Sequence, residues 1–185
     1  MTHGDRQYLA YYNADRRMVV AQRSLDDSAF ERFVLPSEST KPPRHSEATS
    51  TIQGWDSHNY ITMAVDRDGH LHLSGNMHRD PLLYFRSDVP GDITTLTQVH
   101  AMVGSEEDHC TYPKFKTAPN GSLLFHYRDG GSGNGNEIYN VYDTATRTWS
   151  RFLKNGLISG QGKRNAYQRG PVLGPDGWYH LLWMW

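Results

Sequence analysis

The stretch that decides the fold is residues 61–75, ITMAVDRDGHLHLSG. It holds two short runs of alternating apolar and polar residues around the turn dipeptide Asp68-Gly69. Two such runs joined by a tight turn indicate a β-hairpin. In a hairpin, the start of the first strand lies beside the end of the second. His58 and His78 stand just outside these two strands, so we expect their side chains to meet at one edge of the sheet.

Similar turns recur at Asn120-Gly121 and Asp176-Gly177, so that Gly69, Gly121 and Gly177 are separated by 52 and 56 positions. Each of these turns lies between two short strand patterns. A period of about 50 residues with four short strands per repeat is typical of a β-propeller. The alternative is a β-sandwich in which the turns recur by coincidence.

The sequence therefore predicts an all-β protein, a β-propeller of four-stranded blades. The expected blades fall near residues 1–50, 51–105 and 106–160, with an incomplete blade at 161–185, in one partial domain. Propellers have about 4–8 blades. Strand patterns at both ends of the chain favour a fragment of a larger propeller, and no oligomer is expected. Only Ser24–Phe33 shows a helical pattern, and it is weak.

Composition excludes several classes of partner. Lys and Arg number 19 against 20 Asp and Glu, so there is no basic footprint for nucleic acid. No apolar run approaches the roughly 20 residues that span a bilayer. Met1–Ala10 is polar where a signal peptide would be apolar. One cysteine, Cys110, excludes an internal disulfide framework.

Polar residues stand at corresponding places in successive repeats. His58 and Tyr112 open the first strands of two repeats, and His78 and Arg128 lie at the ends of the neighbouring strands. We expect the mouth of a central channel to gather one set of side chains: His58, His78, Tyr112, Arg128 and Tyr167, with Asn59, Asn76 and Arg169 beside them.

This set fits the β-elimination of a uronic-acid polysaccharide. The reaction needs a partner that neutralises the sugar carboxylate, a base for the C5 proton and an acid for the leaving oxygen. A guanidinium pairs with a carboxylate through two hydrogen bonds, which suits Arg128. Histidine titrates near neutral pH, and tyrosine can donate a proton. No cofactor is required.

Structural roles are the alternative for each residue. A histidine near a strand end is often a surface residue, Tyr112 before Pro113 can be a packing residue, and Arg128 before Asp129 can be a surface pair. His70 and His72 alternate with leucines on the other strand face, so we expect them to be structural.

Metal and phosphate sites are poorly supported. His109-Cys110 lacks a second spaced pair of ligands, and Asp66–Gly69 lacks the length of a calcium loop, so we expect a plain turn there. A structural cation is not indicated. The segment 129–136 is rich in glycine but has no Lys-Ser/Thr ending. We expect it to be a flexible loop near the channel mouth, in position to contact sugar.

Five motifs carry a family resemblance. In chain order they are Gly54–Tyr60, Ser74–His78, Thr111–Phe115, Tyr127–Gly130 and Asn165–Pro171. Together they resemble the BNR-repeat-containing proteins that include the ulvan lyases, from about Gln7 onward. The resemblance implies a seven-bladed propeller that acts on the sulfated uronate-rhamnose polysaccharide of green algae.

The resemblance also implies roles for single residues. His58 and Tyr112 become the acid/base pair, with the order of the two left open. Arg128 and His78 become binders of the uronate carboxylate, and Tyr167 a substrate contact. Members of this family are usually exported, which implies a secreted or periplasmic protein. The family domain is about twice as long as this chain, which leaves the activity of the chain alone open.

Two other functions remain open. A sialidase-like glycoside hydrolase would need a carboxylate pair, but only Asp56 and Asp129 lie near the candidate residues, and Ser87–Gly91 does not match the aspartate box. A non-catalytic glycan-binding propeller would use exposed aromatic residues such as Trp55 and Trp178 to stack on sugar rings.

Overall fold

The computed structural model describes residues 1–36, 50–51 and 56–185. Within these ranges all strands pair in antiparallel sheets, and the single helical element is the 3-10 turn η1 (Ile93–Thr95). The prediction of an all-β protein is confirmed. The weak helical pattern of Ser24–Phe33 is wrong, because its second half enters strand β4 (Glu31–Val34). In the described part of the chain no helix is long and apolar enough to cross a bilayer.

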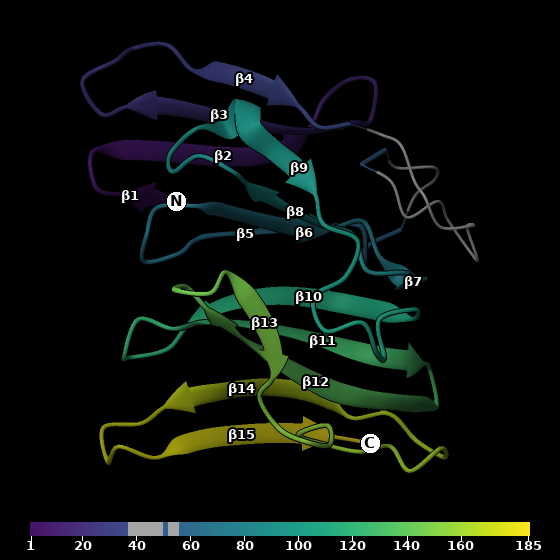
Figure 1. Cartoon of the computed structure of the whole chain (residues 1–185). Coiled ribbons are helices and arrows are strands. Elements are labelled where there is room, and N and C mark those ends of the chain that lie inside the picture. The colour runs from purple at the N-terminus through teal and green to yellow at the C-terminus, as the bar shows by residue number, and fades with distance from the viewer. Residues whose placement is uncertain (37–49, 52–55) are drawn as a thin grey trace.

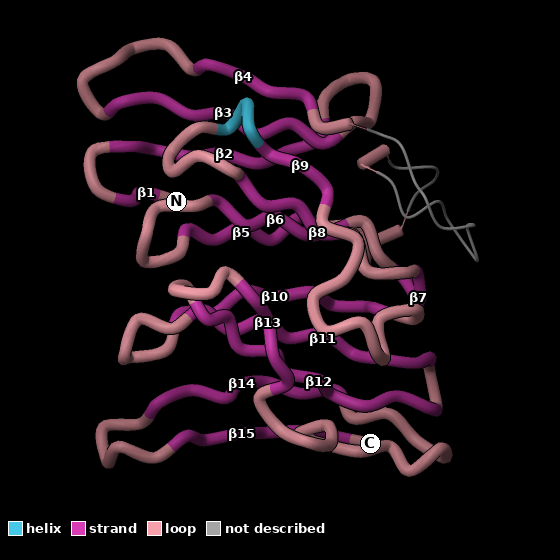
Figure 2. The backbone as a smooth tube through the Cα atoms, in the orientation of Figure 1, coloured by secondary structure: helices cyan, strands magenta, loops and turns pink. Residues whose placement is uncertain are grey.

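Four sheets follow one another along the chain (Figures 1 and 2). The first two contain β1 (Thr2–His3), β2 (Arg6–Tyr12), β3 (Met18–Ser24) and β4, then β5 (Ile61–Val65), β6 (Leu71–Gly75), β8 (Tyr84–Ser87) and β9 (Leu96–Gln98). The last two contain β7 (His78–Asp80), β10 (Cys110–Thr117), β11 (Leu123–Gly131), β12 (Asn134–Asp143) and β13 (Thr148–Arg151), then β14 (Tyr167–Leu173) and β15 (Tyr179–Met184).

The sheets lie one above another in chain order in Figure 1. Strand β5 contacts β2 on one side and β10 on the other, so the first strands of the second and third sheets are neighbours. Such a stack of small antiparallel sheets is consistent with successive propeller blades. The number of blades and the closure of the propeller stay predictions.

The hairpin that opened the argument is present. Strands β5 and β6 pair from Ile61–Gly75 to Val65–Leu71. The Asp66 carboxylate accepts hydrogen bonds from the backbone nitrogens of Asp68 (3.0 Å) and His70 (2.9 Å). An aspartate that folds back on its own turn in this way fixes the turn.

The glycine-rich segment 129–136 is not a flexible loop. Strands β11 and β12 continue through it, with Gly130 paired to Gly135 and Gly131 to Asn134. The chain reverses over only two residues, Ser132 and Gly133. Gly130 has φ +101°, and a Cβ atom there would collide with the Asn134 carbonyl. Glycine therefore serves the close approach of two backbones in a tight hairpin.

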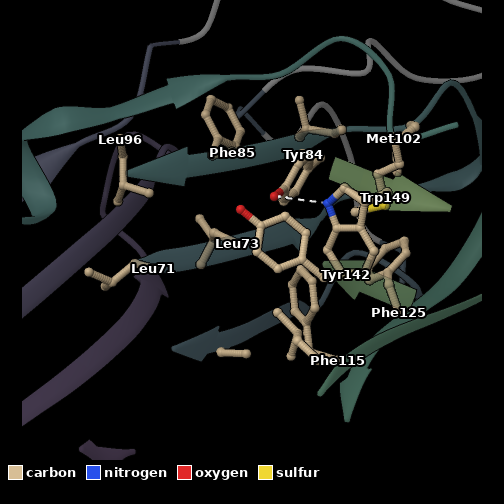
Figure 3. Packing of buried hydrophobic residues seen from close by; sticks show 14 of the residues in the cluster. Leu71, Leu73, Tyr84, Phe85, Leu96, Met102, Phe115, Phe125, Tyr142 and Trp149 are labelled. Atoms are coloured by element: carbon tan, nitrogen blue, oxygen red, sulfur yellow. Dashed lines mark hydrogen bonds between the residues drawn. The ribbon is translucent and has the colours of Figure 1, made fainter. Parts of the chain in front are cut away.

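The core between the second and third sheets is aromatic (Figure 3). The Trp149 indole nitrogen donates to the Tyr84 hydroxyl at 3.2 Å. His72, fully buried, lies in this cluster with its ring nitrogens 2.7 Å from the Tyr84 hydroxyl and 3.2 Å from Asp66 Oδ2. Burial lowers the pKa of His72. The expectation that His72 is structural is confirmed, and so is that for His70, which is buried beside Ser87.

We expect Phe125→Ala to lower the free energy of unfolding by about 3–5 kcal/mol, the usual cost of truncating a buried phenylalanine. Phe125 is fully buried and packs on Phe115 and Trp149. Denaturant unfolding measures the change. Phe152, 54% exposed, provides the matched control, since Phe152→Ala removes the same atoms from the surface. Equal losses for the two variants would contradict this description of the core.

Candidate active site

Two histidines, one in the turn before β5 and one in β7, lie face to face. The rings of His58 and His78 have centroids 3.8 Å apart and planes inclined by 17°. The sequence predicted that the two side chains would meet, but at one edge of the sheet that holds β5 and β6. After Gly75 the chain leaves the second sheet, because Asn76 has φ +54°, and His78 begins β7, which pairs with β10. His78 thus belongs to the third sheet, and the pair spans the junction of two sheets.

Asp56 connects the two rings. Its Oδ1 lies 2.5 Å from His58 Nδ1, and its Oδ2 lies 2.5 Å from His78 Nδ1. Burial raises the pKa of Asp56, but hydrogen bonds from the His58 backbone and from both rings outweigh it and lower the pKa to about 2. Since the carboxylate is ionised, each ring donates its Nδ1 proton to it. In an imidazole that carries its single proton on Nδ1, the Nε2 atom is a proton acceptor.

Sequence reasoning noted Asp56 only as a nearby carboxylate and missed this bridge. A local signal was available in the spacing Asp56-Ser57-His58. The His58 backbone nitrogen donates to Asp56 Oδ1 at 2.9 Å, which is the turn that aspartate makes with the residue two positions later. This turn places the His58 ring beside the same carboxylate.

The group Asp56, His58 and His78 also has the residue types of a metal site. Ligands of a tetrahedral zinc ion, at about 2.0–2.1 Å from the metal, lie about 3.3 Å from one another. The oxygen–nitrogen distances of 2.5 Å in this group are shorter than that. Direct hydrogen bonds therefore fit the geometry better than shared coordination.

Tyr112 continues the chain of contacts. Its hydroxyl lies 3.1 Å from His58 Nε2. Tyr112 has φ +59°, an uncommon conformation for a residue other than glycine. It stands where the pairing of β10 with β11 shifts between Thr111 and Lys114. Because a bulge of this kind redirects a side chain, the irregular backbone accounts for the direction of the Tyr112 phenol.

Arg128 lies beneath Tyr112. The residue is 2% exposed. Its Cζ atom is 5.0 Å from the centroid of the Tyr112 ring. One Nη atom donates to Thr111 Oγ1 at 3.0 Å, while the Nε atom is buried without a partner. No carboxylate among the described residues forms an ion pair with it. The alternative of a surface pair with Asp129 is wrong, and a buried cation without an anion is costly unless a ligand supplies one.

The remaining predicted residues differ in exposure. Tyr167 begins β14 and is 40% exposed; Ser132, Asn165 and the Arg128 guanidinium lower its pKa. Arg169 lies on the same strand and is exposed. Asn59 is buried, and Asn76 is fully buried with its amide donating to the Thr51 carbonyl at 3.0 Å. Asn76 has no surface for a substrate contact and supports the chain at the end of β6.

Of the two tryptophans expected to stack on sugar, Trp178 lies among the described residues. Trp178 is 75% exposed in the turn between β14 and β15. Trp55 lies outside the described residues.

A pocket adjoins this cluster between the third and fourth sheets. Its volume is about 430 Å³, within the range of small-molecule sites. Tyr112 and Tyr167 form part of its wall, so the pocket adjoins the His58–Tyr112 contact. Its other lining residues are Tyr60, Lys114, His126, Glu137, Ala166, Gln168, Arg169, Gly170 and Met184.

Curated relatives of the chain are ulvan lyases. The long isoform from Glaciecola sp. (strain KUL10) is 29% identical over 168 residues, which cover 70% of this chain and 17% of that protein. The short isoform from Alteromonas sp. (strain LOR) is 30% identical over 172 residues, which cover 70% of this chain and 33% of that protein. The chain thus spans a third or less of the length of these relatives.

Solved structures of polysaccharide lyases share the fold. The crystal structure of polysaccharide lyase Uly1 matches 91% of this chain and 44% of its own, with a TM-score of 0.72 and 19% identity. An ulvan lyase of family PL25 bound to -[GlcA(1-4)Rha3S]- matches 83% of this chain and 37% of its own, with a TM-score of 0.62 and 17% identity.

The family model of the BNR repeat-containing family member matches residues 6–185. That match covers nearly the whole chain and agrees with the order of motifs in the sequence and with the stack of antiparallel sheets. The chain therefore belongs to the BNR repeat-containing family.

Proposed function

We propose that this protein is a polysaccharide lyase that cleaves a uronic-acid glycan such as ulvan by β-elimination. The observation that carries the proposal is a buried guanidinium without an anionic partner, Arg128, beside a hydrogen-bonded His58–Tyr112 pair. The ulvan lyase relatives and the oligosaccharide held by a structural neighbour support the substrate class. The activity of this chain, which spans only part of those proteins, belongs to the proposal.

Arg128 receives the uronate carboxylate in this account. Its unpartnered Nε and its Nη groups can form the two-pronged hydrogen bond that guanidinium makes with carboxylate. Pairing withdraws charge from the carboxylate, which makes the neighbouring C5 proton more acidic. His78, whose ring is partly exposed beside His58, can donate a second hydrogen bond to the same group from Nε2 only in its doubly protonated form, because Asp56 holds its Nδ1 proton.

We assign His58 as the base and Tyr112 as the acid. The ionised Asp56 holds the proton of His58 on Nδ1, so Nε2 accepts the C5 proton of the substrate. The C5–H electron pair forms the C4–C5 double bond, the C4–O bond breaks, and the Tyr112 hydroxyl protonates the leaving oxygen. The proton on His58 Nε2 then returns to the Tyr112 oxygen across the 3.1 Å contact, which restores both groups.

Asp56 acts through His58 as a positioning residue. We expect Asp56→Asn to lower kcat by about 10–100-fold with little change in KM, a typical cost of removing a carboxylate that orients an imidazole. An asparagine cannot accept a proton from both rings through two carboxylate oxygens, so the population of the Nδ1–H tautomer falls. Steady-state kinetics measure the first effect, and nitrogen NMR of the histidine rings measures the second.

The matched control is Asp176→Asn. Asp176 also pairs with a histidine, His180, at 3.1 Å, but on the exposed turn between β14 and β15. Wild-type kcat and unchanged ring tautomers in Asp56→Asn would remove Asp56 from the account.

Product analysis separates this proposal from the two other functions. A lyase leaves a conjugated double bond in the new terminal sugar, a hydrolase leaves a reducing end without one, and a binding module leaves the polymer intact. A hydrolase would need two carboxylates flanking the scissile bond. Asp56 is bound by two histidines, and the Glu137 carboxylate at the pocket lies 2.5 Å from His126.

We also propose that the protein acts outside the cytoplasm, in the periplasm or the medium. A polymeric glycan such as ulvan, which the names of the curated relatives give as their substrate, is met there.

A further inference from the structure

We propose that Thr111 is a positioning residue of the candidate site, and that its hydroxyl fixes the Arg128 guanidinium relative to the strand that carries His78. This inference rests on the proposed function, and it names the residue that keeps the carboxylate-binding groups in place. Thr111 is fully buried, so we expect it to act through its neighbours and not to touch the glycan.

Thr111 lies on the middle strand of three. In β10 it pairs with Arg128 of β11 on one side and with His78 of β7 on the other. Tyr112 follows it in the chain. Residues directly opposite one another on paired strands are the ones whose side chains interact in a sheet. One buried residue thus has three candidate site residues as its immediate neighbours.

The Thr111 hydroxyl accepts two hydrogen bonds from these neighbouring strands. An Nη atom of Arg128 donates to Oγ1 at 3.0 Å, and the backbone nitrogen of Arg79 donates to the same atom at 2.9 Å. A hydroxyl oxygen has two lone pairs, so it can accept both bonds at once. The oxygen atom therefore bridges β11 and β7 across β10.

The bond from Arg128 restrains the plane of the guanidinium. The Nε atom of Arg128 is buried without a partner, and no carboxylate among the described residues forms an ion pair with the group. A hydrogen bond from a charged donor is about twice as strong as one between neutral groups. Because a carboxylate meets two N–H groups of the planar fork side by side, a rotated guanidinium would bind it poorly.

The bond from Arg79 restrains the strand that carries His78. Arg79 has φ +64°, an uncommon conformation for a residue other than glycine. Thr111 satisfies the backbone nitrogen at this position, directly after His78 in the chain. The same oxygen atom thus fixes the relative position of the two groups that we propose as partners of one carboxylate.

Thr111→Val and Thr111→Ser separate the hydroxyl from the shape of the side chain. Valine replaces Oγ1 by a methyl group of similar size, and serine keeps the oxygen. We expect Thr111→Val to lower kcat/KM on ulvan by about 10–100-fold, since a displacement of about 1 Å in a site can cost about 10²-fold. Thr111→Ser should keep most of the activity. Equal losses in both variants, or no loss in Thr111→Val, overturn the proposal.

Thr62→Val is the matched control for stability. Thr62 Oγ1 also accepts a hydrogen bond from a backbone nitrogen of β10, that of Phe115 at 3.2 Å, and this bond reaches no candidate site residue. We expect Thr62→Val to lower the unfolding temperature while kcat/KM stays near that of the wild type. A fall in kcat/KM equal to that of Thr111→Val would show that the lost backbone contact suffices, which also overturns the proposal.

A double-mutant cycle shows whether Thr111 acts through Arg128. In a protein that already carries Arg128→Met, we expect Thr111→Val to lower kcat/KM little further, because the guanidinium that it positions is absent. Two residues that act independently would instead give losses that multiply. Multiplied losses would therefore contradict a positioning role for Thr111.

Failure of the proposed function would look different, because it concerns the wild-type protein. If the wild type forms no unsaturated product, nitrogen NMR of the Arg128 side chain tests the positioning without a substrate. A hydrogen-bonded guanidinium rotates slowly about its Cζ–N bonds, so we expect separate Nη signals in the wild type and in Thr111→Ser, and merged signals in Thr111→Val. The same pattern of signals in all three proteins overturns the proposal.

Discussion

Replacing Tyr112 by phenylalanine will abolish turnover while glycan binding stays near that of the wild type. The substitution removes one oxygen atom, the atom that lies 3.1 Å from His58 Nε2 and that we assign as the acid for the leaving oxygen. Without it, C4–O cleavage must expel an unprotonated alkoxide. General acid catalysis contributes about 10²–10⁴-fold to the rate. We therefore expect kcat to fall by at least about 10²-fold.

The measurement is steady-state formation of unsaturated product together with calorimetric binding of an ulvan oligosaccharide. Tyr179→Phe is the control, because Tyr179 is 55% exposed on β15 and its hydroxyl takes no part in the proposed site. His58→Ala should lose turnover to a similar degree, since it removes the base and the proton's return path. Near-normal kcat in either variant would show that the acid/base assignment is wrong.

Replacing Arg128 by alanine will raise KM and lower kcat together. The carboxylate must be held in the bound substrate and held more strongly as charge develops on it during proton abstraction. Removing one donor to a developing oxyanion costs about 10²–10³-fold in kcat, and the lost ground-state pairing adds to this in KM. We therefore expect kcat/KM to fall by more than 10³-fold.

Arg128 is only 2% exposed, so its variants need a folding control. Arg128→Lys keeps the charge but lacks the planar fork, and we expect it to recover part of KM and little of kcat. Arg128→Met keeps most of the volume without charge and should behave like Arg128→Ala while unfolding at a temperature closer to that of the wild type. An Arg128→Met variant that is folded and has wild-type kcat and KM would remove Arg128 from the site.

Much of the fold could be predicted because its signals are local. The hairpin of β5 and β6 follows from alternating residues around Asp68-Gly69, and the same pattern located β10–β11 and β14–β15. The glycine-rich segment misled the prediction, because composition does not distinguish a mobile loop from a hairpin whose strands approach closely. Gly130 and Gly135 serve the second arrangement.

The candidate site could be predicted in its members but not in its connections. His58, Tyr112 and Arg128 do come together, as the register of the repeats suggested. The bridge through Asp56 depends on a turn geometry, and the direction of Tyr112 depends on a positive φ at a bulge. Hydrophobic periodicity predicts neither feature, because it indicates only which face of a strand is buried.

Asn59 and Asn76 are buried, unlike the other two predicted substrate contacts, Tyr167 and Arg169. Asn76 follows β6 in the sequence next to the histidine of the site, yet the redirected backbone takes its side chain into the interior, where it bonds to Thr51. Proximity in sequence to a site residue thus did not predict exposure. The exposed Tyr167 and Arg169 remain proposed substrate contacts.

The most direct test of the central claim is the ultraviolet absorbance of a conjugated C4–C5 unsaturated uronate, followed while the full-length protein acts on ulvan and on other uronate polymers. We predict a steady rise with ulvan that is lost in Tyr112→Phe. A folded protein that produces no rise on any uronate polymer would contradict the lyase account and favour a glycan-binding module.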